Sequence, residues 1–243
     1  MRTVAVVLAG GSGERFGTSV PKQLLPFAGR PLLEHSVAAF DEAPAVDSVL
    51  VVMAASHAGQ AREVLAAGGY RKLSGVIPGG MTRVESTRRA IGELGDECDV
   101  LFHDAARPLV DQQIIAACVT ALAEHRAVGV AVPSSDTIAL VSEGIMVAMP
   151  RRDSLVRLQT PQGFRLSIIR RAHELAAADP RFGELPATDD CGIVLRYLPE
   201  LGVHVVPGSD RNIKITYPRD LAVAEALLRE PVARDQGRGC GGW

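Results

Sequence analysis

The stretch that decides the fold runs from Val4 to Arg15 and reads V-A-V-V-L-A-G-G-S-G-E-R. Its first five residues form a continuous apolar run of strand length, which is typical of a strand buried on both faces of a parallel sheet. Three glycines, Gly10, Gly11 and Gly13, stand close behind this run. Glycines allow backbone N–H groups to approach a phosphate closely. The stretch therefore predicts an α/β fold with an anion-binding loop after its first strand.

Two cations accompany the glycines, Arg15 within the loop and Lys22 beyond it, and both suit phosphate oxygens. The loop is not a Walker A motif, because no G-x-x-x-x-G-K-[ST] spacing can be drawn through it. It is not G-x-G-x-x-G either, since Phe16 stands where the third glycine would be. These failures argue against P-loop ATPases and dinucleotide-binding dehydrogenases. An ordinary tight turn is the alternative, but the glycines and cations favour a loop that holds a phosphorylated ligand.

The rest of the chain alternates short apolar runs with helical patterns. Strands are expected at residues 4–8, 46–53, 99–102 and 127–132, and helices at residues 31–40, 58–67, 83–94 and 111–124. This alternation predicts an α/β fold with a doubly wound, mainly parallel sheet and helices on both faces. The glycine-rich loop then lies at the carboxyl end of the first strand, where open α/β sheets bind ligands.

The pattern changes between Pro133 and Pro150. Apolar runs at residues 137–141 and 145–149 flank Ser142-Glu143-Gly144, which is a hairpin signature. A hairpin inserted into a parallel α/β chain is expected to project from the sheet, and its apolar residues then need a covering surface. Either a second subunit or the chain's own domain can supply that surface.

Composition bounds the classes of partner. The 243 residues carry a formal net charge of −2, which gives no electrostatic argument for binding nucleic acid or an anionic membrane. The four cysteines form no C-x-x-C pair, so neither a zinc site nor a redox motif is indicated, and they suggest cytosolic thiols. We expect a cytoplasmic protein with one domain at residues 1–229 and a disordered tail at residues 230–243.

Two segments after predicted strands carry candidate binding residues. Gly79-Gly80 leads into the expected helix at residues 83–94, whose N-terminus favours anions, although a simple capped helix is the more economical interpretation. Asp104 ends an apolar strand, where a carboxylate can hold Mg²⁺ or orient a hydroxyl. The adjacent His103 is interpreted as structural.

Later segments add polar candidates. Arg151-Arg152-Asp153 and the T-P-Q-G-F segment at residues 160–164 supply guanidinium and hydroxyl groups that suit a phosphomonoester, with a solvated basic turn as the alternative. Thr188-Asp189-Asp190 is interpreted as a helix cap with acidic first-turn residues. Lys214 lies in an otherwise apolar run that is expected to form a strand, either at an edge or aimed at an anion.

Taken together, these segments resemble the 2-C-methyl-D-erythritol 4-phosphate cytidylyltransferase family and its close relative, ribitol-5-phosphate cytidylyltransferase. The resemblance runs from about Thr3 to Leu228 and rests on L-A-G-G-S-G-E-R-F with P-K-Q, G-G-x-x-R-x-x-S, H-D-A-A-R-P, T-P-Q-G-F and N-I-K-I-T, in the family's order. It implies a Rossmann-like fold, CTP and a polyol phosphate as substrates, and Mg²⁺ as cofactor. It also implies a homodimer in which a β-arm at about residues 134–153 reaches over the neighbouring active site.

The resemblance assigns roles to individual residues. Those expected to wrap the CTP are Ala9, Gly10, Gly11, Gly13, Arg15 and Lys22. Those expected to read the base and its surroundings are Gly80, Arg83 and Ser86, and those expected near the ribose are Ala105 and Arg107. Asp104 is expected beside Mg²⁺ and the substrate, and Lys214 is expected to complete the pocket. Those expected to hold the substrate phosphate from the other subunit are Thr137, Arg152 and Thr160. The residues expected to be catalytic are then Arg15, Lys22, Asp104 and Lys214.

The implied reaction is in-line attack of a polyol phosphate oxygen on the α-phosphorus of CTP, with release of pyrophosphate. Two positions depart from the methylerythritol pattern: Gly10, where those enzymes often have alanine, and Ala139, where they usually have lysine. The leading interpretation is an enzyme of non-mevalonate isoprenoid synthesis, and the alternative is a ribitol-5-phosphate enzyme that makes CDP-ribitol. A non-catalytic nucleotide-binding protein is a remote third, which the presence of Arg15, Lys22 and Asp104 disfavours.

Overall fold

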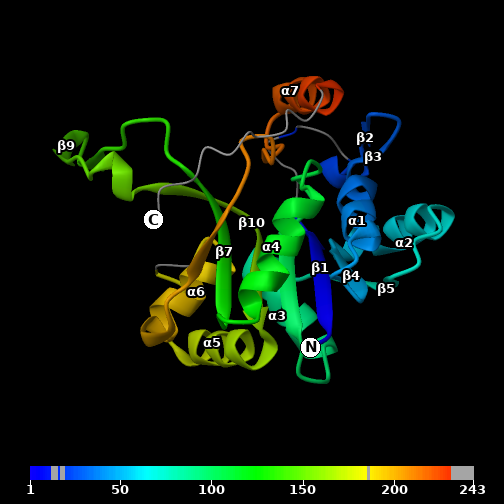
Figure 1. Cartoon of the computed structure of the whole chain (residues 1–243), viewed down its shortest axis with the longest axis horizontal. Coiled ribbons are helices and arrows are strands. Elements are labelled where there is room, and N and C mark those ends of the chain that lie inside the picture. The colour runs from blue at the N-terminus through cyan, green and yellow to red at the C-terminus, as the bar shows by residue number, and fades with distance from the viewer. Residues whose placement is uncertain (12–15, 17–19, 185–186, 231–243) are drawn as a thin grey trace.

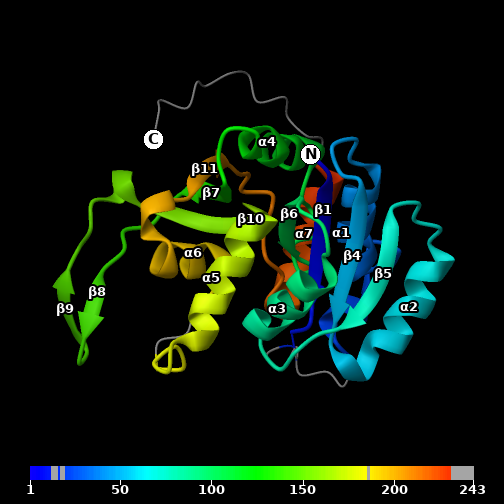
Figure 2. The same cartoon turned by 90° about the horizontal axis from the view of Figure 1, so that it is seen from below.

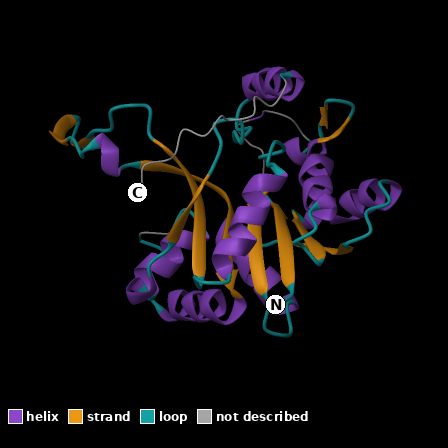
Figure 3. Cartoon of the chain, viewed as in Figure 1, coloured by secondary structure: helices purple, strands orange, loops and turns teal. Residues whose placement is uncertain are grey.

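The computed structural model describes residues 1–11, 16, 20–184 and 187–230. Within them, a seven-stranded sheet runs through the centre of the molecule with helices on both faces (Figures 1 and 3). The strand order is β11-β7-β10-β6-β1-β4-β5. The strands are β1 Thr3–Ala9, β4 Ser48–Met53, β5 Leu73–Pro78, β6 Asp99–Asp104, β7 Ala127–Pro133, β10 Val156–Arg165 and β11 His204–Pro207. The predicted α/β fold is confirmed.

The sheet is mainly parallel, and β10 is its antiparallel member. β10 pairs antiparallel with both β6 and β7, whereas the other neighbouring strands of this sheet pair in parallel. The order of the chain through the sheet reverses at β1, because β4 and β5 extend it on one side and β6 lies on the other. Such a reversal opens a crevice outside the carboxyl ends of the two adjoining strands.

Both faces of β1 are covered. Val6 and Leu8 belong to one core cluster, while Ala5 and Val7 belong to the cluster on the opposite face. All of β1 is buried, because alternate side chains of a strand point to opposite faces. A strand with two buried faces needs a continuous apolar run, as the sequence has.

The helices divide between the two faces. One cluster takes residues from α1 (Leu32–Glu42), α2 (Ala58–Ala67) and α4 (Gln112–Leu122). The opposite cluster takes residues from α3 (Arg83–Glu93), α5 (Leu166–Ala178) and α6 (Asp190–Tyr197). Figure 2 shows α4 and α5 on opposite sides of β10. A third, smaller cluster joins α7 (Pro218–Arg229) to Phe16, Phe27, Leu32 and Ile215.

The predicted helices form, and side-chain caps set several of their starts. Thr82, Asp111 and Asp189 each accept a hydrogen bond from the backbone N–H three residues later, at 3.1, 2.8 and 2.8 Å. These bonds satisfy N–H groups that have no partner within the helix. The interpretation of residues 188–190 as a helix cap is confirmed for Asp189.

The predicted hairpin forms as β8 (Leu140–Ser142) and β9 (Ile145–Ala148), which pair with each other in a separate sheet. Both turn residues have positive φ, 51° at Glu143 and 80° at Gly144, as tight hairpins require. Residues 134–153, here called the arm, extend away from the central sheet (Figures 1 and 2). Every residue of β8 and β9 is exposed, so the chain's own domain does not cover them.

The predicted strand around Lys214 does not form: residues 213–216 have no strand assignment. The remaining short elements are β2 Pro26–Phe27, β3 Arg30–Pro31 and the 3-10 helices Lys22–Leu24, Ala55–His57, Arg152–Ser154 and Pro199–Leu201. In the part of the chain that the structure describes, no helix is both long and apolar enough to cross a membrane.

Candidate active site

A cleft opens where β1 and β6 end. Leu8 of β1 and Asp104 of β6 are partners in the strand register, so the residues that follow them meet at the reversal of strand order. The cleft has a volume of about 310 Å³. Of the predicted site residues, it brings together Gly10, Gly11, Lys22, Arg83, Ser86, Asp104 and Lys214.

Some predicted residues lie beneath the cleft or beyond the described part of the chain. Ala9 and Ala105 are completely buried, and Ala105 N–H donates to the carbonyl of Leu8 at 3.0 Å. They therefore join the ends of β1 and β6 and offer no side chain to a ligand in the cleft. Gly13 and Arg15 lie outside the described residues.

The glycines bring backbone segments close to Ser86. A Cβ at Gly10 would lie 3.0 Å from Ser86 Oγ. A Cβ at Gly80 would lie 2.2 Å from Cβ of Glu85, the residue before Ser86. Ser86 Oγ accepts from Gly80 N–H at 3.1 Å and donates to the carbonyl of Thr82 at 2.9 Å. The hydroxyl proton of Ser86 is thus used to hold the start of α3, and Ser86 can present only an acceptor to a ligand.

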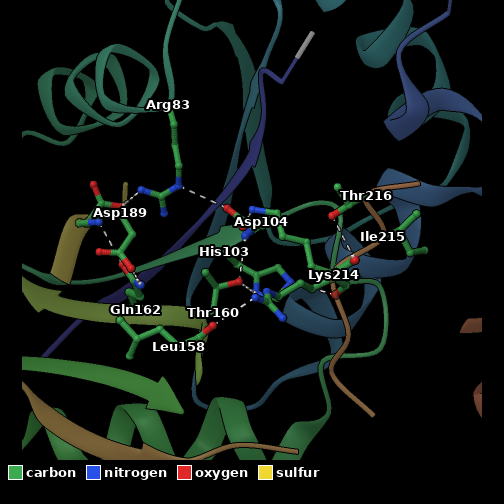
Figure 4. A network of polar contacts seen from close by, with 12 residues as sticks. Arg83, His103, Asp104, Leu158, Thr160, Gln162, Asp189, Lys214, Ile215 and Thr216 are labelled. Atoms are coloured by element: carbon green, nitrogen blue, oxygen red, sulfur yellow. Dashed lines mark hydrogen bonds and ion pairs between the residues drawn. The ribbon is translucent and has the colours of Figure 1, made fainter. Parts of the chain in front are cut away.

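Asp104 is at the centre of an ion-pair network in the cleft (Figure 4). Its Oδ1 lies 3.4 Å from Arg83 Nε, and its Oδ2 lies 2.7 Å from Lys214 Nζ. Burial alone would raise the pKa of Asp104, but the charges of Arg83 and Lys214 outweigh it and hold the pKa well below its usual range. The carboxyl is therefore ionised at neutral pH.

The position of Lys214 follows from the residues around it. Asn212 is completely buried and its Nδ2 donates to the carbonyl of Thr160 at 2.9 Å. Ile215 is also completely buried, and its N–H donates to the carbonyl of Ala106 at 2.8 Å. With a fixed residue on each side of it in the sequence, Lys214 points toward Asp104. A segment without strand structure is therefore enough to aim the lysine at a carboxylate.

Lys22 reaches the cleft from the start of a 3-10 helix. Its Nζ donates to the carbonyl of Ile215 at 2.7 Å. Next to it, Gln23 Nε2 donates to the carbonyl of Gly11 at 3.4 Å. The two side chains connect the glycine-rich loop with the segment that carries Lys214.

Thr160 contacts the backbone of Asp104, and His103 contacts Thr160 (Figure 4). Thr160 Oγ1 accepts from the backbone N–H of Asp104 at 3.1 Å and lies 3.0 Å from His103 Nδ1. His103 Nε2 lies 3.0 Å from the carbonyl oxygen of Arg107. His103 is completely buried, and burial lowers its pKa to about 4, so the ring is neutral at pH 7. The interpretation of His103 as structural agrees with these contacts.

A second, smaller hollow of about 120 Å³ adjoins the cleft. Arg83, Asp104 and Lys214 line both spaces and are here called the shared wall. Arg107 and Thr160 line the smaller hollow but not the cleft. Arg107 donates to the carbonyls of Asn212 and Leu158 at 2.7 and 3.3 Å, so it is fixed on the side of the wall away from the glycines.

Asp190 is a site residue that sequence reasoning missed. Its carboxylate is completely buried, with Oδ2 2.7 Å from Arg83 Nη1 and Oδ1 3.3 Å from His173 Nε2. Gln162 Oε1 accepts from the backbone N–H groups of Asp190 and Cys191, each at 3.1 Å. Arg83 is therefore held between two carboxylates, Asp104 in the wall and Asp190 behind it.

Thr137 and Arg152 lie on the exposed arm, and neither lines the cleft or the smaller hollow of its own chain. Thr160 was expected to act with them from the other subunit. Within its own chain, Thr160 lies directly beside Asp104, because β10 places it next to the end of β6. The structure thus separates Thr160 from the two arm residues.

Comparison with known proteins gives one consistent family. The family model described as 2-C-methyl-D-erythritol 4-phosphate cytidylyltransferase matches residues 3–230. A protein of that name from Thermobifida fusca is 54% identical over 241 residues, which cover 96% of each chain. A bifunctional ribulose 5-phosphate reductase/CDP-ribitol pyrophosphorylase from Haemophilus influenzae is 36% identical over 94% of this chain and 48% of its own length. The crystal structure of 4-diphosphocytidyl-2C-methyl-D-erythritol synthase from Anaerococcus prevotii matches with a TM-score of 0.81, 27% identity, and coverage of 94% of this chain and 99% of its own.

Proposed function

This chain belongs to the 2-C-methyl-D-erythritol 4-phosphate cytidylyltransferase family, and we propose that its reaction, transfer of a cytidylyl group from CTP to that polyol phosphate, takes place in the cleft between β1 and β6. The observation that carries the assignment is the network of Arg83, Asp104 and Lys214 directly beside Gly10 and Gly11. It combines fixed charges with open backbone at the reversal of strand order, where phosphorylated ligands bind.

The two spaces suit the two substrates. CTP occupies the larger cleft, where Gly10, Gly11 and Lys22 face its phosphates. The polyol phosphate occupies the smaller hollow beside Arg107 and Thr160. The shared wall then borders the place where the two reacting groups meet. This division is supported by the residues that line each space.

The proposed step is in-line displacement. A phosphate oxygen of the polyol forms a bond to the α-phosphorus of CTP, and the bond from that phosphorus to the bridging oxygen breaks, so pyrophosphate leaves with the electron pair. No proton has to be removed from an ionised phosphate. The protein therefore acts by positioning and by neutralising charge. Lys22 and Arg15 are proposed to neutralise the crowded phosphates, and Lys214 to orient the attacking group against Asp104.

A Mg²⁺ ion fits this site in one way. The described residues contain no cluster of three or more His, Cys, Asp or Glu side chains that could hold a metal, and Asp104 is already paired with two cations. Mg²⁺ commonly keeps water and substrate phosphate ligands and takes only one or two carboxylates. We therefore propose that the triphosphate supplies most ligands and Asp104 is the protein ligand. When bound, the ion would withdraw negative charge from the phosphates.

The arm is proposed to act in a homodimer, where Thr137 and Arg152 reach the acceptor phosphate in the partner's site. Exposed apolar side chains on the arm support this, since Ile145, Met146 and Met149 are 68%, 71% and 69% exposed. Apolar area of this kind is stabilised when a second subunit covers it. A cytoplasmic location is also proposed, which suits the free, buried thiols of Cys98, Cys118 and Cys191.

A turnover assay tests the proposed function. Purified protein with CTP and Mg²⁺ should release pyrophosphate with 2-C-methyl-D-erythritol 4-phosphate, and much more slowly with D-ribitol 5-phosphate. The second substrate is included because the Haemophilus influenzae relative bears a CDP-ribitol name and because Gly10 and Ala139 depart from the usual methylerythritol pattern. Pyrophosphate release with D-ribitol 5-phosphate alone would reassign the acceptor, and no release with either would refute the proposed reaction.

A further inference from the structure

The hydroxyl of Thr160 has two partners inside the protein. Its Oγ1 accepts from the backbone N–H of Asp104 at 3.1 Å, since an N–H can only donate. The same Oγ1 lies 3.0 Å from His103 Nδ1. Figure 4 shows these contacts. Thr160 is only 4% exposed and His103 is completely buried, so both contacts are shielded from water.

The direction of the second contact follows from the other nitrogen of His103. His103 Nε2 lies 3.0 Å from the backbone carbonyl oxygen of Arg107. A carbonyl oxygen can only accept, so Nε2 carries the proton of the imidazole. The ring is completely buried, and its two nitrogens meet a carbonyl oxygen and a hydroxyl, so no carboxylate of the described residues at hydrogen-bond distance balances a second proton and Nδ1 carries a lone pair. Thr160 Oγ1 must therefore donate its single proton to His103 Nδ1.

Thr160 Oγ1 keeps one unused lone pair. A hydroxyl has one proton and two acceptor lone pairs; the proton goes to His103, and one lone pair accepts from Asp104. Thr160 borders the smaller hollow, so any group that it meets there has to donate. An ionised phosphate has only acceptor oxygens, whereas a polyol hydroxyl can donate.

We propose that His103 is a positioning residue that fixes Thr160 as a hydrogen-bond acceptor, so that Thr160 reads a hydroxyl of the polyol and not its phosphate. The proposal rests on the proposed function, in which the smaller hollow takes the acceptor substrate. It replaces the expectation that Thr160 holds the substrate phosphate. It leaves that task to cationic side chains, Arg107 of the same chain and Arg152 of the arm.

Two substitutions at His103 separate hydrogen-bond direction from simple packing. Asparagine places an amide oxygen near the position of Nδ1 and can still accept from Thr160. Glutamine places an amide nitrogen near Nε2 and can donate to the Arg107 carbonyl, but leaves Thr160 without its acceptor. His103→Gln should raise KM for 2-C-methyl-D-erythritol 4-phosphate roughly 10-fold, the scale of one misdirected hydrogen bond, with KM for CTP unchanged. His103→Asn should change the same KM less than about 3-fold.

A coupled pair of variants asks whether His103 acts through Thr160. Thr160→Val keeps the shape of the side chain and removes the hydroxyl, so it should raise KM for the polyol phosphate on its own. In the Thr160→Val background, His103→Gln should add no further change. Equal effects of His103→Gln and His103→Asn, or full additivity with Thr160→Val, would overturn the proposal.

The hydrogen-bond direction can also be measured without any substitution. Long-range ¹H–¹⁵N NMR of the imidazoles in the wild-type protein should show His103 as the neutral tautomer protonated at Nε2 from pH 6 to 8. A proton on Nδ1 would overturn the proposal even if the enzyme is active. Conversely, an absence of wild-type turnover with any polyol phosphate would refute the proposed function, while the NMR spectrum would still decide the direction of the Thr160 bond.

Discussion

Asp190 Oδ2 lies 2.7 Å from Arg83 Nη1, and the carboxylate is completely buried. Burial alone would raise the pKa of Asp190, but Arg83 and the hydrogen bond from His173 outweigh it and lower the pKa. Arg83 in turn contacts Asp104. A buried carboxylate behind the cleft therefore fixes an arginine that belongs to its wall.

Replacing Asp190 should reduce both stability and activity. Asp190→Ala leaves Arg83 without its shorter ion pair, and breaking a buried pair in this way costs about 3 kcal/mol in the free energy of unfolding. Because Arg83 then moves toward Asp104, kcat/KM should also fall. Urea unfolding and steady-state kinetics measure the two effects. Asp210→Ala, which breaks the exposed pair with Arg157, is the control and should change neither. A wild-type urea midpoint for Asp190→Ala would contradict the structural role.

The role of Asp190 could not be predicted from the sequence. An aspartate at the start of a helix is the usual sign of a cap, and Asp189 does cap α6. Asp190 looks the same in the sequence, but its partner Arg83 is 107 residues away. No local pattern identifies such a pair. Asp104 and Lys214, by contrast, could be singled out from the sequence. Asp104 ends an apolar strand, where open α/β sheets bind ligands, and a lysine inside an apolar run is unusual.

The strands show the same difference between local sequence patterns and distant contacts. The buried strands β1, β4, β6 and β7 were predictable because their two covered faces demand continuous apolar runs. β10 was not, since residues 156–165 include Arg157, Gln159 and Pro161. It forms a strand because β6 and β7 flank it, and its register shifts between Leu158 and Gln162. That irregularity accommodates a proline that cannot donate to a neighbouring strand.

Acid should weaken the protein through two carboxylates, Asp104 in the wall and Asp190 behind it. Asp104 and Asp190 both have pKa values below the ordinary range. Such groups stabilise the fold above their unfolded pKa of about 4, and their contribution is lost as the pH falls toward the folded-state pKa. The free energy of unfolding should therefore decrease below about pH 4. In Asp104→Asn the decrease should be smaller, as measured by urea unfolding between pH 7 and pH 3.

Asp99→Asn is the matched control for this pH dependence. Asp99 lies at the opposite end of β6 and also pairs with an arginine, Arg165, at 3.3 Å. Its pKa shifts the other way, because burial raises it. Removing Asp99 should therefore not reduce the loss of stability in acid. If both substitutions flatten the profile equally, the low pKa of Asp104 is not the cause.

Lys22→Ala should lower kcat about 10²-fold or more, as expected for the loss of one preorganised donor to a phosphate oxygen. The measurement is pyrophosphate release at saturating CTP and polyol phosphate. Lys72→Ala is the control, because Lys72 Nζ donates to the carbonyl of Ala43 at 2.6 Å, a contact of the same kind as that of Lys22 with Ile215. Lys72 does not line the cleft, so its variant should turn over normally. Near-normal turnover of Lys22→Ala would reject its catalytic assignment.

The arm gives a prediction about assembly. Ile145 and Met146 are 68% and 71% exposed on β9, so the double variant Ile145→Glu with Met146→Glu should prevent a second subunit from covering them, since burying unpaired charges is costly. Analytical ultracentrifugation should show a dimer for the wild type and a monomer for the variant. If Arg152 acts in the partner's site, the monomer should also lose turnover while its fold, followed by circular dichroism, remains.

A charge placed on another exposed apolar position controls for this result. Val223 on α7 is 51% exposed, and Val223→Glu should remain dimeric and active, because α7 lies apart from the arm (Figure 1). Arg152→Ala then separates assembly from catalysis: it should leave the dimer intact and raise KM for the polyol phosphate. A monomeric wild type with full turnover would show that the cleft needs no partner, and the arm would have to serve another purpose. A dimer that Ile145→Glu with Met146→Glu does not dissociate would place the interface elsewhere on the chain.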